Sequence, residues 1–327
     1  MFNISHSKAK LARRCLKAYQ YRYIDKIRKR VKSMPLTIGS LVHSCLETWF
    51  LGEDYEQEID NWIKNEYNKM FKEERVEFED VPNLVRGMME GYEQFWEDQG
   101  LEMVWVETEF ELEIADGIQL IGKIDGIAED NRGRCWTVEH KTAEKMPGEE
   151  LRMYDTQVVL YAGVAAELDF PKQTGVIWDY LRKRLPAKPQ VLKGGGLSTA
   201  ARQDTTYEVF MQTLKEMKLS PKGYEDYLET LKEKRNNFFR HVKMPVNKNM
   251  ITGVRNDIII TSNRLIELEE RGDRWDRNIT RDCSWCDYRT LCLAELKGED
   301  TSHLLKFDFV RSKHGNKTKK KVRRDSR

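Results

Sequence analysis

The sequence predicts an α/β fold in which a small mixed β-sheet is flanked by helices. Between residues 36 and 50, apolar side chains recur at i, i+3 and i+4, the spacing of one buried helix face. From residue 103 the apolar period changes to two, which is typical of half-buried strands. A helical pattern and a further strand follow up to residue 183, so helices and strands alternate as in layered α/β domains.

Helices are expected on both sides of these strands. Residues 4–30 have the pattern of one basic helix opened by Ser5 or Ser7. A second helix follows Pro35 and carries His43 on the flank of its apolar stripe. Further helical sequence is found at residues 55–99, 154–168, 205–240 and 252–271.

Three strands are expected between residues 103 and 143, and a fourth at 174–183. The second and third are joined by the turn-rich tetrapeptide DNRG at residues 130–133. A turn centred there places Asp125 opposite Val138 or Glu139, with Cβ atoms about 5 Å apart. Asp125 and Glu139 are therefore expected to be neighbours.

The composition indicates a globular protein that does not cross a membrane. The chain has 327 residues, of which 39% are hydrophobic and 34% charged. It has no run of about 18 apolar residues and no signal-peptide pattern at its start, so we expect a cytoplasmic protein. We predict one domain over residues 1–310, with a helical insertion at about 186–250 that begins in an exposed loop rich in Pro, Gly and Lys.

The last 17 residues, 311–327, form a basic tail. They hold nine Lys or Arg against one acid, Asp325, whereas the rest of the chain carries a net charge of −6. Such a tail is either a disordered, solvated segment or an arm that contacts nucleic acid, and the sequence leaves both open.

The stretch TVEHKT at residues 137–142 combines an acid and a base in one strand. Because strand side chains alternate, Glu139 and Lys141 share a face and His140 points to the other. Asp125 and Glu139 could hold a hard divalent cation that lowers the pKa of an attacking water beside a phosphodiester. Lys141 could orient the water or stabilise negative charge, and His43 could supply an imidazole ligand. The alternative is an exposed ion pair at a strand end.

Four motifs in order resemble the RecB-like branch of the PD-(D/E)xK nuclease superfamily. They are GSLVH at residues 39–43, GKIDGI at 122–127, EHK at 139–141 and QVVLY at 157–161. The resemblance implies a nuclease core in which His43, Asp125 and Glu139 bind Mg²⁺ or Mn²⁺, and Lys141 is the catalytic lysine. Gln157 and Tyr161 would line the substrate side. This sequence has EHK where many relatives carry DYK, and the acid is retained.

Glu107 and Glu109 lie on the strand before the Asp125 strand. In some relatives an acid on this strand supports the metal, and either residue fits that role. A solvated strand face is the other interpretation of both.

Six cysteines occur, and four of them suggest a metal centre. Cys283, Cys286 and Cys292 are closely spaced, one ligand short of a tetrahedral zinc or an iron–sulfur cluster, and Cys15 can be the fourth. AddB-type and CRISPR-associated single-domain members of the same branch carry one N-terminal and three C-terminal cysteines around a [4Fe–4S] cluster. The resemblance thus favours a [4Fe–4S] cluster that joins the two chain ends. Cys45 and Cys135 are expected to be packing residues.

Contacts with nucleic acid are only broadly indicated. Basic candidates are Arg13, Arg14, Lys17, Arg22, the 182–193 loop and the tail. Aromatic candidates for stacking on single-stranded bases are Tyr19, Tyr21, Tyr23 and Trp285. Burial or solvation is the competing interpretation for each of them.

The sequence and its resemblance together predict a metal-dependent DNA nuclease, most simply an exonuclease on single-stranded ends, of phage or bacterial DNA processing, recombination or repair. A structure-specific endonuclease and a non-catalytic iron–sulfur DNA-binding protein are the alternatives. No G-x-x-x-x-G-K-[ST] loop is present, so helicase or recombination partners would supply any motor.

Overall fold

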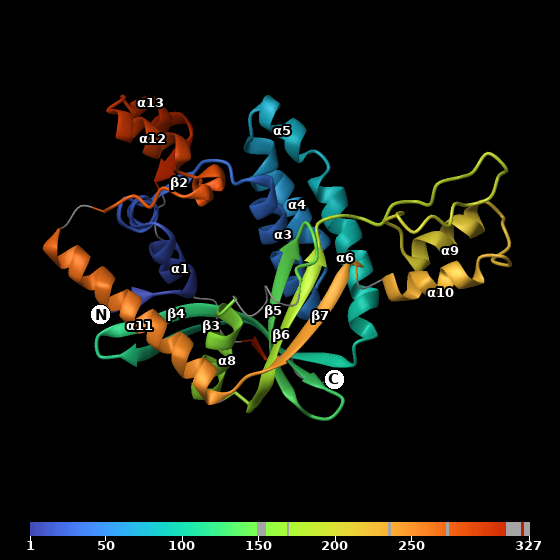
Figure 1. The fold of residues 1–327 in the computed structure, drawn as a ribbon, viewed down its shortest axis with the longest axis horizontal. Coiled ribbons are helices and arrows are strands. Elements are labelled where there is room, and N and C mark those ends of the chain that lie inside the picture. Colours follow the sequence, from blue (N-terminus) through green and yellow to red (C-terminus); the bar gives the residue numbers. More distant parts are fainter. Residues whose placement is uncertain (149–154, 169, 235–236, 273–274, 312–321, 324–327) are drawn as a thin grey trace.

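The computed structural model describes residues 1–148, 155–168, 170–234, 237–272, 275–311 and 322–323. A twisted sheet lies at the centre with helices on both of its faces, as the sequence predicts (Figure 1). Among the described residues no helix is both long and apolar enough to cross a membrane.

In the described part of the chain, seven strands form the main sheet. Six follow the order β7-β6-β5-β4-β3-β9, and β1 pairs in parallel with β4. The pairs β3–β4 and β4–β5 are antiparallel and β5–β6 is parallel, so the sheet is mixed. The strands are β1 (Phe2–Ile4), β3 (Leu101–Ala115), β4 (Ile118–Asp130), β5 (Cys135–Ala143), β6 (Gln173–Arg182), β7 (Phe239–Pro245) and β9 (Val322–Arg323). A separate ribbon pairs β2 (Ile27–Lys29) with β8 (Phe309–Arg311).

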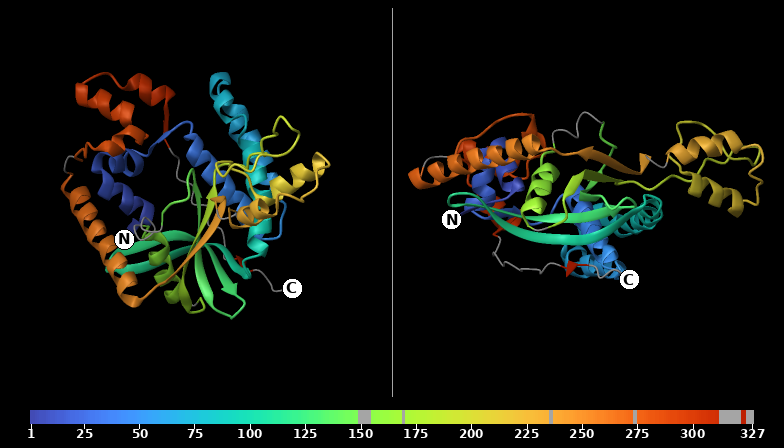
Figure 2. Two further views of the ribbon diagram at one scale, coloured as in Figure 1. Left: turned by 45° about the vertical axis from the view of Figure 1, so that its right-hand side comes forward. Right: turned by 90° about the horizontal axis from the view of Figure 1, so that it is seen from below.

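Most of the described helices surround the sheet, and two form a pair that lies away from it. The body contains α1 (His6–Arg14), α2 (Leu16–Tyr19), α3 (Met34–Phe50), α4 (Glu56–Asn65), α5 (Lys72–Phe78), α6 (Val81–Glu97), α8 (Gln157–Glu167), α11 (Lys248–Arg271), α12 (Arg289–Lys297) and α13 (Ser302–Phe307). The outlying pair is α9 (Tyr207–Glu216) and α10 (Glu225–Lys234), which projects from one end of the molecule (Figures 1 and 2).

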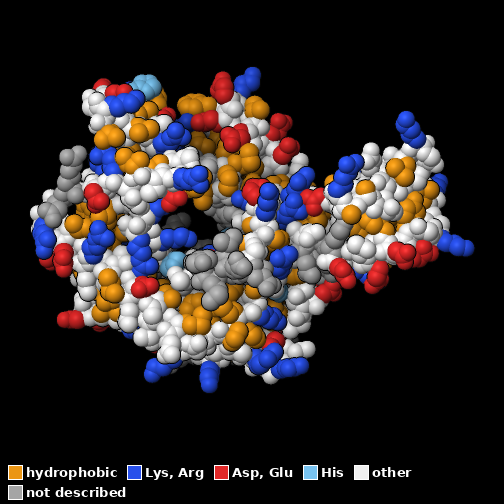
Figure 3. All heavy atoms as spheres, in the orientation of Figure 1, with side chains coloured by type: hydrophobic (Ala, Val, Ile, Leu, Met, Phe, Trp, Pro, Cys, Tyr) orange, Lys and Arg blue, Asp and Glu red, His pale blue; other side chains and the backbone are white. Residues whose placement is uncertain are grey.

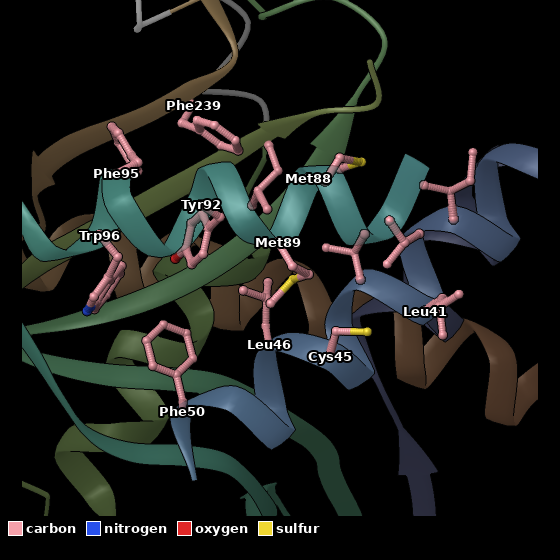
Figure 4. Close-up of a cluster of buried hydrophobic side chains, with 14 of the residues drawn as sticks. Leu41, Cys45, Leu46, Phe50, Met88, Met89, Tyr92, Phe95, Trp96 and Phe239 are labelled. Atoms are coloured by element: carbon pink, nitrogen blue, oxygen red, sulfur yellow. The ribbon is translucent and has the colours of Figure 1, made fainter. Parts of the chain in front are cut away.

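One face of the sheet packs against α3 and α6. Leu46 and Phe50 of α3 meet Met89, Tyr92 and Trp96 of α6 in a dense aromatic and aliphatic core (Figure 4). The other face packs against α8, α11 and α1 through a second apolar cluster. Because α3 and α8 lie on different sides, β5 can present alternate side chains to two separate environments.

The N-terminal segment is not the single helix predicted for residues 4–30. It begins with β1, continues as α1, and breaks at Cys15, where φ of −165° and ψ of 117° are extended values. A further π-helical turn at Gln20–Ile24 and β2 complete it. The periodicity of basic residues is similar on both sides of the break, so it does not reveal the interruption.

The expected insertion at about 186–250 ends earlier than predicted. It contains α9 and α10, but residues 239–245 form β7, which pairs with β6 in the main sheet. In the tail, Val322 and Arg323 form β9 against β3, where the sequence predicts no strand. Most of the remaining tail lies outside the described residues.

Candidate metal and catalytic site

Three carboxylates lie at one level on three neighbouring strands. Val106 of β3 is paired with Gly126 of β4, and Gly126 with Val138 of β5. The next level of the sheet holds Glu107 after Val106, Asp125 before Gly126 and Glu139 after Val138, because β4 runs antiparallel to both neighbours. The register therefore places Asp125 opposite Glu139, one of the two positions predicted from the turn. In addition, Asp125 Oδ2 accepts a hydrogen bond of 2.9 Å from the backbone N–H of His140.

Three of the candidate ligand atoms form a compact group. Oxygen or nitrogen atoms of His43, Glu107 and Asp125 all lie within 4.8 Å of one another, a spacing that a single metal ion can bridge. His43 reaches the group from α3, with Nδ1 3.6 Å from Asp125 Oδ2. Burial lowers the pKa of His43, which favours the neutral imidazole that ligates metals. Glu139 lies beside this group but is not part of it.

Glu107 has an unusual backbone. Its φ of 45° lies in the left-handed region, where a residue with a side chain is strained. Residues with such strained backbones cluster at functional sites. Its carboxylate forms an ion pair with Lys123, whose Nζ is also 3.4 Å from Glu47 Oε2. A positively charged group, the Lys123 ammonium, therefore already lies beside the Glu107 carboxylate. Glu109, two residues on, is exposed instead.

Glu139 is buried and incompletely satisfied. It is 2% exposed, and Oε2 has no hydrogen-bond partner among the described residues. Burial and the nearby Asp125 carboxylate raise the pKa of Glu139 to about 8. Lys141 pairs with Oε1, but a buried carboxylate oxygen without a partner still costs free energy unless a further cation or donor contacts it. The orphaned oxygen and the all-oxygen and imidazole donor set therefore fit a hard divalent ion.

Lys141 lies on the same face of β5 as Glu139, as predicted. Its Nζ is 2.6 Å from Glu139 Oε1, 3.5 Å from Asp155 Oδ2 and 3.4 Å from Gln157 Oε1. Burial lowers the pKa of Lys141, but the surrounding carboxylates outweigh it and the net shift is upward. The ammonium is therefore charged and held by three groups.

Of the two α8 residues, Gln157 reaches Lys141 but Tyr161 is buried. The Tyr161 ring is 5% exposed and packs edge-on against Phe110 at 5.2 Å. Burial raises the pKa of Tyr161, so its hydroxyl remains protonated. Little of Tyr161 is therefore open to a substrate, but its hydroxyl lies near the site, because Glu139 and Asp125 are among the charges that raise its pKa and Gln157 hydrogen-bonds to it.

His140 points to the opposite face of the sheet, again as predicted. Its Nδ1 is 2.6 Å from Asp179 Oδ2, and Asp179 also accepts a hydrogen bond from Tyr92 and pairs with His241. These four side chains are fully or largely buried between the sheet and α6. They tie β5, β6 and β7 together beneath the carboxylates.

One residue of the site was left undecided by sequence reasoning, and another was missed. The role of Glu107 as a member of the compact group was left open, because alternation could not separate it from Glu109. Asp155 was not considered at all. Its position two residues before Gln157 could have identified it, since Asp155 Oδ1 accepts the backbone N–H of Gln157 at the start of α8.

A family model described as the PD-(D/E)XK nuclease superfamily matches residues 3–293. The chain belongs to the PD-(D/E)XK nuclease superfamily. Members of this superfamily are phosphodiesterases that use Mg²⁺ or Mn²⁺, so the chain is assigned to metal-dependent nucleases. No curated protein matches the chain in sequence. A solved structure similar to this chain is the "Crystal structure of SSO0001", with 13% identity and a TM-score of 0.31; the match covers 85% of this chain and 94% of that chain.

The four cysteines of this PD-(D/E)XK protein are brought to one region. Cys15, Cys286 and Cys292 border a small cluster that contains Tyr288 and Leu291. The Asn278 backbone connects two of the four: its N–H lies 3.5 Å from Cys15 Sγ, and its carbonyl oxygen lies 3.8 Å from Cys283 Sγ. Arg277 Nε donates to Cys292 Sγ at 3.3 Å. Cys45 and Cys135 are buried in the two apolar clusters of the body, as predicted.

The predicted nucleic-acid contacts of the nuclease are only partly available. Tyr19 and Tyr21 are buried, so of the two interpretations that the sequence leaves open for them, burial is the one observed. Trp285, in contrast, is 70% exposed. Arg13 donates to Thr261 and Lys17 pairs with Glu295, so both have intramolecular partners.

Proposed function

We propose that this chain is a divalent-metal-dependent deoxyribonuclease of the RecB-like branch, acting as an exonuclease on single-stranded DNA ends. The observation that supports this most is the row of Glu107, Asp125 and Glu139 beside the charged Lys141. His43 and these three carboxylates would hold Mg²⁺ or Mn²⁺, which would neutralise a scissile phosphate and acidify an attacking water.

The residues of the chain have separate tasks in this proposal. Lys141 offers a fixed positive charge toward the phosphate or the attacking water. Glu139, Asp155 and Gln157 hold the ammonium in place, which limits the reorganisation needed during reaction. Figure 3 shows a hollow between the parts of the surface formed by α1 and α3, and Lys and Arg side chains near it suit a polyanion.

The decisive experiment compares the wild-type chain with Lys141→Ala on labelled DNA in Mg²⁺ or Mn²⁺. We expect the substitution to reduce cleavage by at least about 100-fold, the typical contribution of a positioned catalytic group. Lys145→Ala is the matched control, because Lys145 is an exposed lysine four residues away. Cleavage by Lys141→Ala at the wild-type rate would refute the assignment of this lysine.

The exonuclease mode and the preference for single strands rest on the resemblance to stand-alone members. They are tested with end-labelled linear and circular single-stranded DNA of the same sequence. An exonuclease degrades the linear form only. Cleavage of the circle, or of branched duplexes alone, would instead indicate an endonuclease.

We also propose that Cys15, Cys283, Cys286 and Cys292 hold a [4Fe–4S] cluster. Support comes from the convergence of these residues from both ends of the chain, and thiolates are the usual ligands of such clusters. Protein purified without oxygen should be brown, and Cys286→Ala should remove the visible absorption. Stoichiometric zinc in colourless, active protein would contradict the cluster.

The setting we propose is the cytoplasm, of a bacterium or of a phage host, in DNA processing, recombination or repair. Helicase or recombination proteins would supply the single-stranded ends. Co-purification of an active helicase with the tagged chain from its own host is the direct measurement, with the Lys141→Ala chain as bait to preserve bound DNA.

A further inference from the structure

A pocket of about 250 Å³ lies beside the carboxylate site and has no part in the metal chemistry. It opens between the first turn of α8, strands β6 and β7, and the first half of α11. Figure 1 shows α8 and α11 next to one another on this side of the sheet. The lining residues are Asp155, Thr156, Val159, Trp178, Met244, Asn249, Met250, Gly253, Val254 and Asp257.

The pocket is directly connected to the proposed catalytic lysine. Asp155 stands between them, with Oδ2 3.5 Å from Lys141 Nζ and its side chain in the pocket wall. Trp178 is the β6 partner of Glu139 in the parallel register, so its indole lies on the same face of the sheet. A nucleotide whose phosphate lies at Lys141 therefore has its base within reach of this pocket.

The chemistry of the walls selects a neutral, flat, partly apolar group. Met244 and Met250 offer thioether surface, on which a planar ring packs well, and Trp178, which is 1% exposed, closes the bottom of the pocket. Asp155 and Asp257 contribute negative charge, which repels phosphate. Carboxylates accept hydrogen bonds from exocyclic amino groups, and they repel carbonyl oxygens at the same place.

We propose that this pocket binds one unpaired base of the DNA strand beside the cleaved phosphate, and that it favours bases with an exocyclic amino group. Cytosine is then preferred over uracil, because the two differ at position 4 by an amino donor against a carbonyl acceptor. This inference rests on the proposed nuclease function for its substrate, but it makes a separate statement about base preference.

The test measures binding of fluorescein-labelled ten-nucleotide strands of oligo-dC and oligo-dU to the whole chain. Ca²⁺ replaces Mg²⁺, and a gel verifies that each probe remains intact. We expect oligo-dC to bind at least about fivefold tighter, the lower end of the discrimination given by good hydrogen-bond pairs to bases. Asp257→Asn should shift the ratio toward oligo-dU, because an amide can donate to the uracil carbonyl.

Gly253→Met provides the blocking variant. A Cβ added at Gly253 meets no atom within 4 Å, so the variant should fold while its side chain fills the pocket. We expect a dC-to-dU ratio near one for this variant. Asn263→Met introduces the same side chain at an exposed position of the same helix and should retain the wild-type ratio.

The outcomes separate this inference from the nuclease function. Equal binding of both probes by the wild-type chain, or an unchanged dC-to-dU affinity ratio in correctly folded Gly253→Met, would refute the proposal that this pocket binds a base. Failure to bind either probe would overturn it as well. If the chain cleaves DNA but shows no base preference, the nuclease proposal stands and the base-pocket proposal fails. If it shows the base preference but no cleavage, the base-pocket proposal stands and the nuclease proposal fails.

Discussion

At the scale of single residues, the burial of the ionised Glu139 side chain destabilises the folded protein. Its pKa is raised from the ordinary 4.5 to about 8, so the unfolded chain ionises this group at lower pH than the folded chain does. Below pH 4.5 both states are protonated and Glu139 costs nothing. The cost grows between pH 4.5 and 8 and is complete above pH 8.

We therefore predict that Glu139→Gln stabilises the metal-free protein near neutral pH. The expected increase in melting temperature is about 2–4 °C, the shift that about 1 kcal/mol produces in a large domain. The difference from wild type should widen as the pH rises from 5 to 8, and activity should be lost. Glu129→Gln, on the exposed face of β4, is the control, and a pH-independent difference in melting temperature would contradict the raised pKa.

Glu107 and Glu109 provide a second comparison between neighbouring residues. Glu107 lies in the compact group with His43 and Asp125, whereas Glu109 is exposed. We predict that Glu107→Gln weakens Mn²⁺ binding by about 10-fold or more, as loss of groups around a metal usually does. Titration calorimetry should show little change for Glu109→Gln, and equal affinities for both variants would remove Glu107 from the site.

At the scale of elements, the packing of α8 on β4 depends on a glycine of the GKIDGI motif. A Cβ at Gly122 would lie 2.6 Å from Phe110 Cζ and 2.9 Å from Tyr161 Oη. These contacts are too short, so the rings of Phe110 on β3 and Tyr161 on α8 must both move. Because α8 also carries Gln157, the displacement reaches the groups that hold Lys141.

We predict that Gly122→Ala destabilises the protein by about 1–3 kcal/mol, the usual cost of overpacking a core. It should also lower cleavage without weakening metal binding. Gly253→Ala is the control, because its Cβ meets nothing and alanine favours a helix, so its stability should stay equal or rise. Normal stability of Gly122→Ala in urea unfolding would show that Tyr161 can adjust freely.

At the scale of the whole molecule, the cysteine region joins the two ends of the chain. Cys15 follows α1, and the other three cysteines lie at or near η4 (Arg281–Trp285) and in α12. The β2–β8 ribbon makes a second connection between the same parts. Because α1 packs on α11, loss of the proposed cysteine-bound cluster should loosen a large part of the N-terminal half.

We predict that Cys15→Ala and Cys286→Ala lower the stability by similar amounts, and that the double variant is no worse than either alone. Residues that act through one centre are not additive. Thermal unfolding of proteins purified without oxygen measures this. Cys45→Ala is a contrasting variant, since Cys45 is a packing residue that should add its own independent cost.

The sequence by itself determined what local backbone geometry encodes. Period-two alternation placed Glu139 and Lys141 on one face of β5 and His140 on the other, and the short turn of the β4–β5 hairpin made Asp125 the neighbour of Glu139. The helix stripe of α3 likewise fixed which residues are buried and left His43 on its flank. Each of these follows from the angle between successive side chains, which does not depend on distant parts of the chain.

Only the tertiary structure decided which distant segments meet. It separated Glu107 from Glu109, buried Tyr19 and Tyr21, added β7 and β9 to the sheet, and placed Asp155 against Lys141. These outcomes depend on packing between elements far apart in sequence, where one apolar surface can be covered by several partners. The spacing of apolar residues shows that one face of a helix or strand is buried. Which other element packs against that face depends on the free energy of the assembled core.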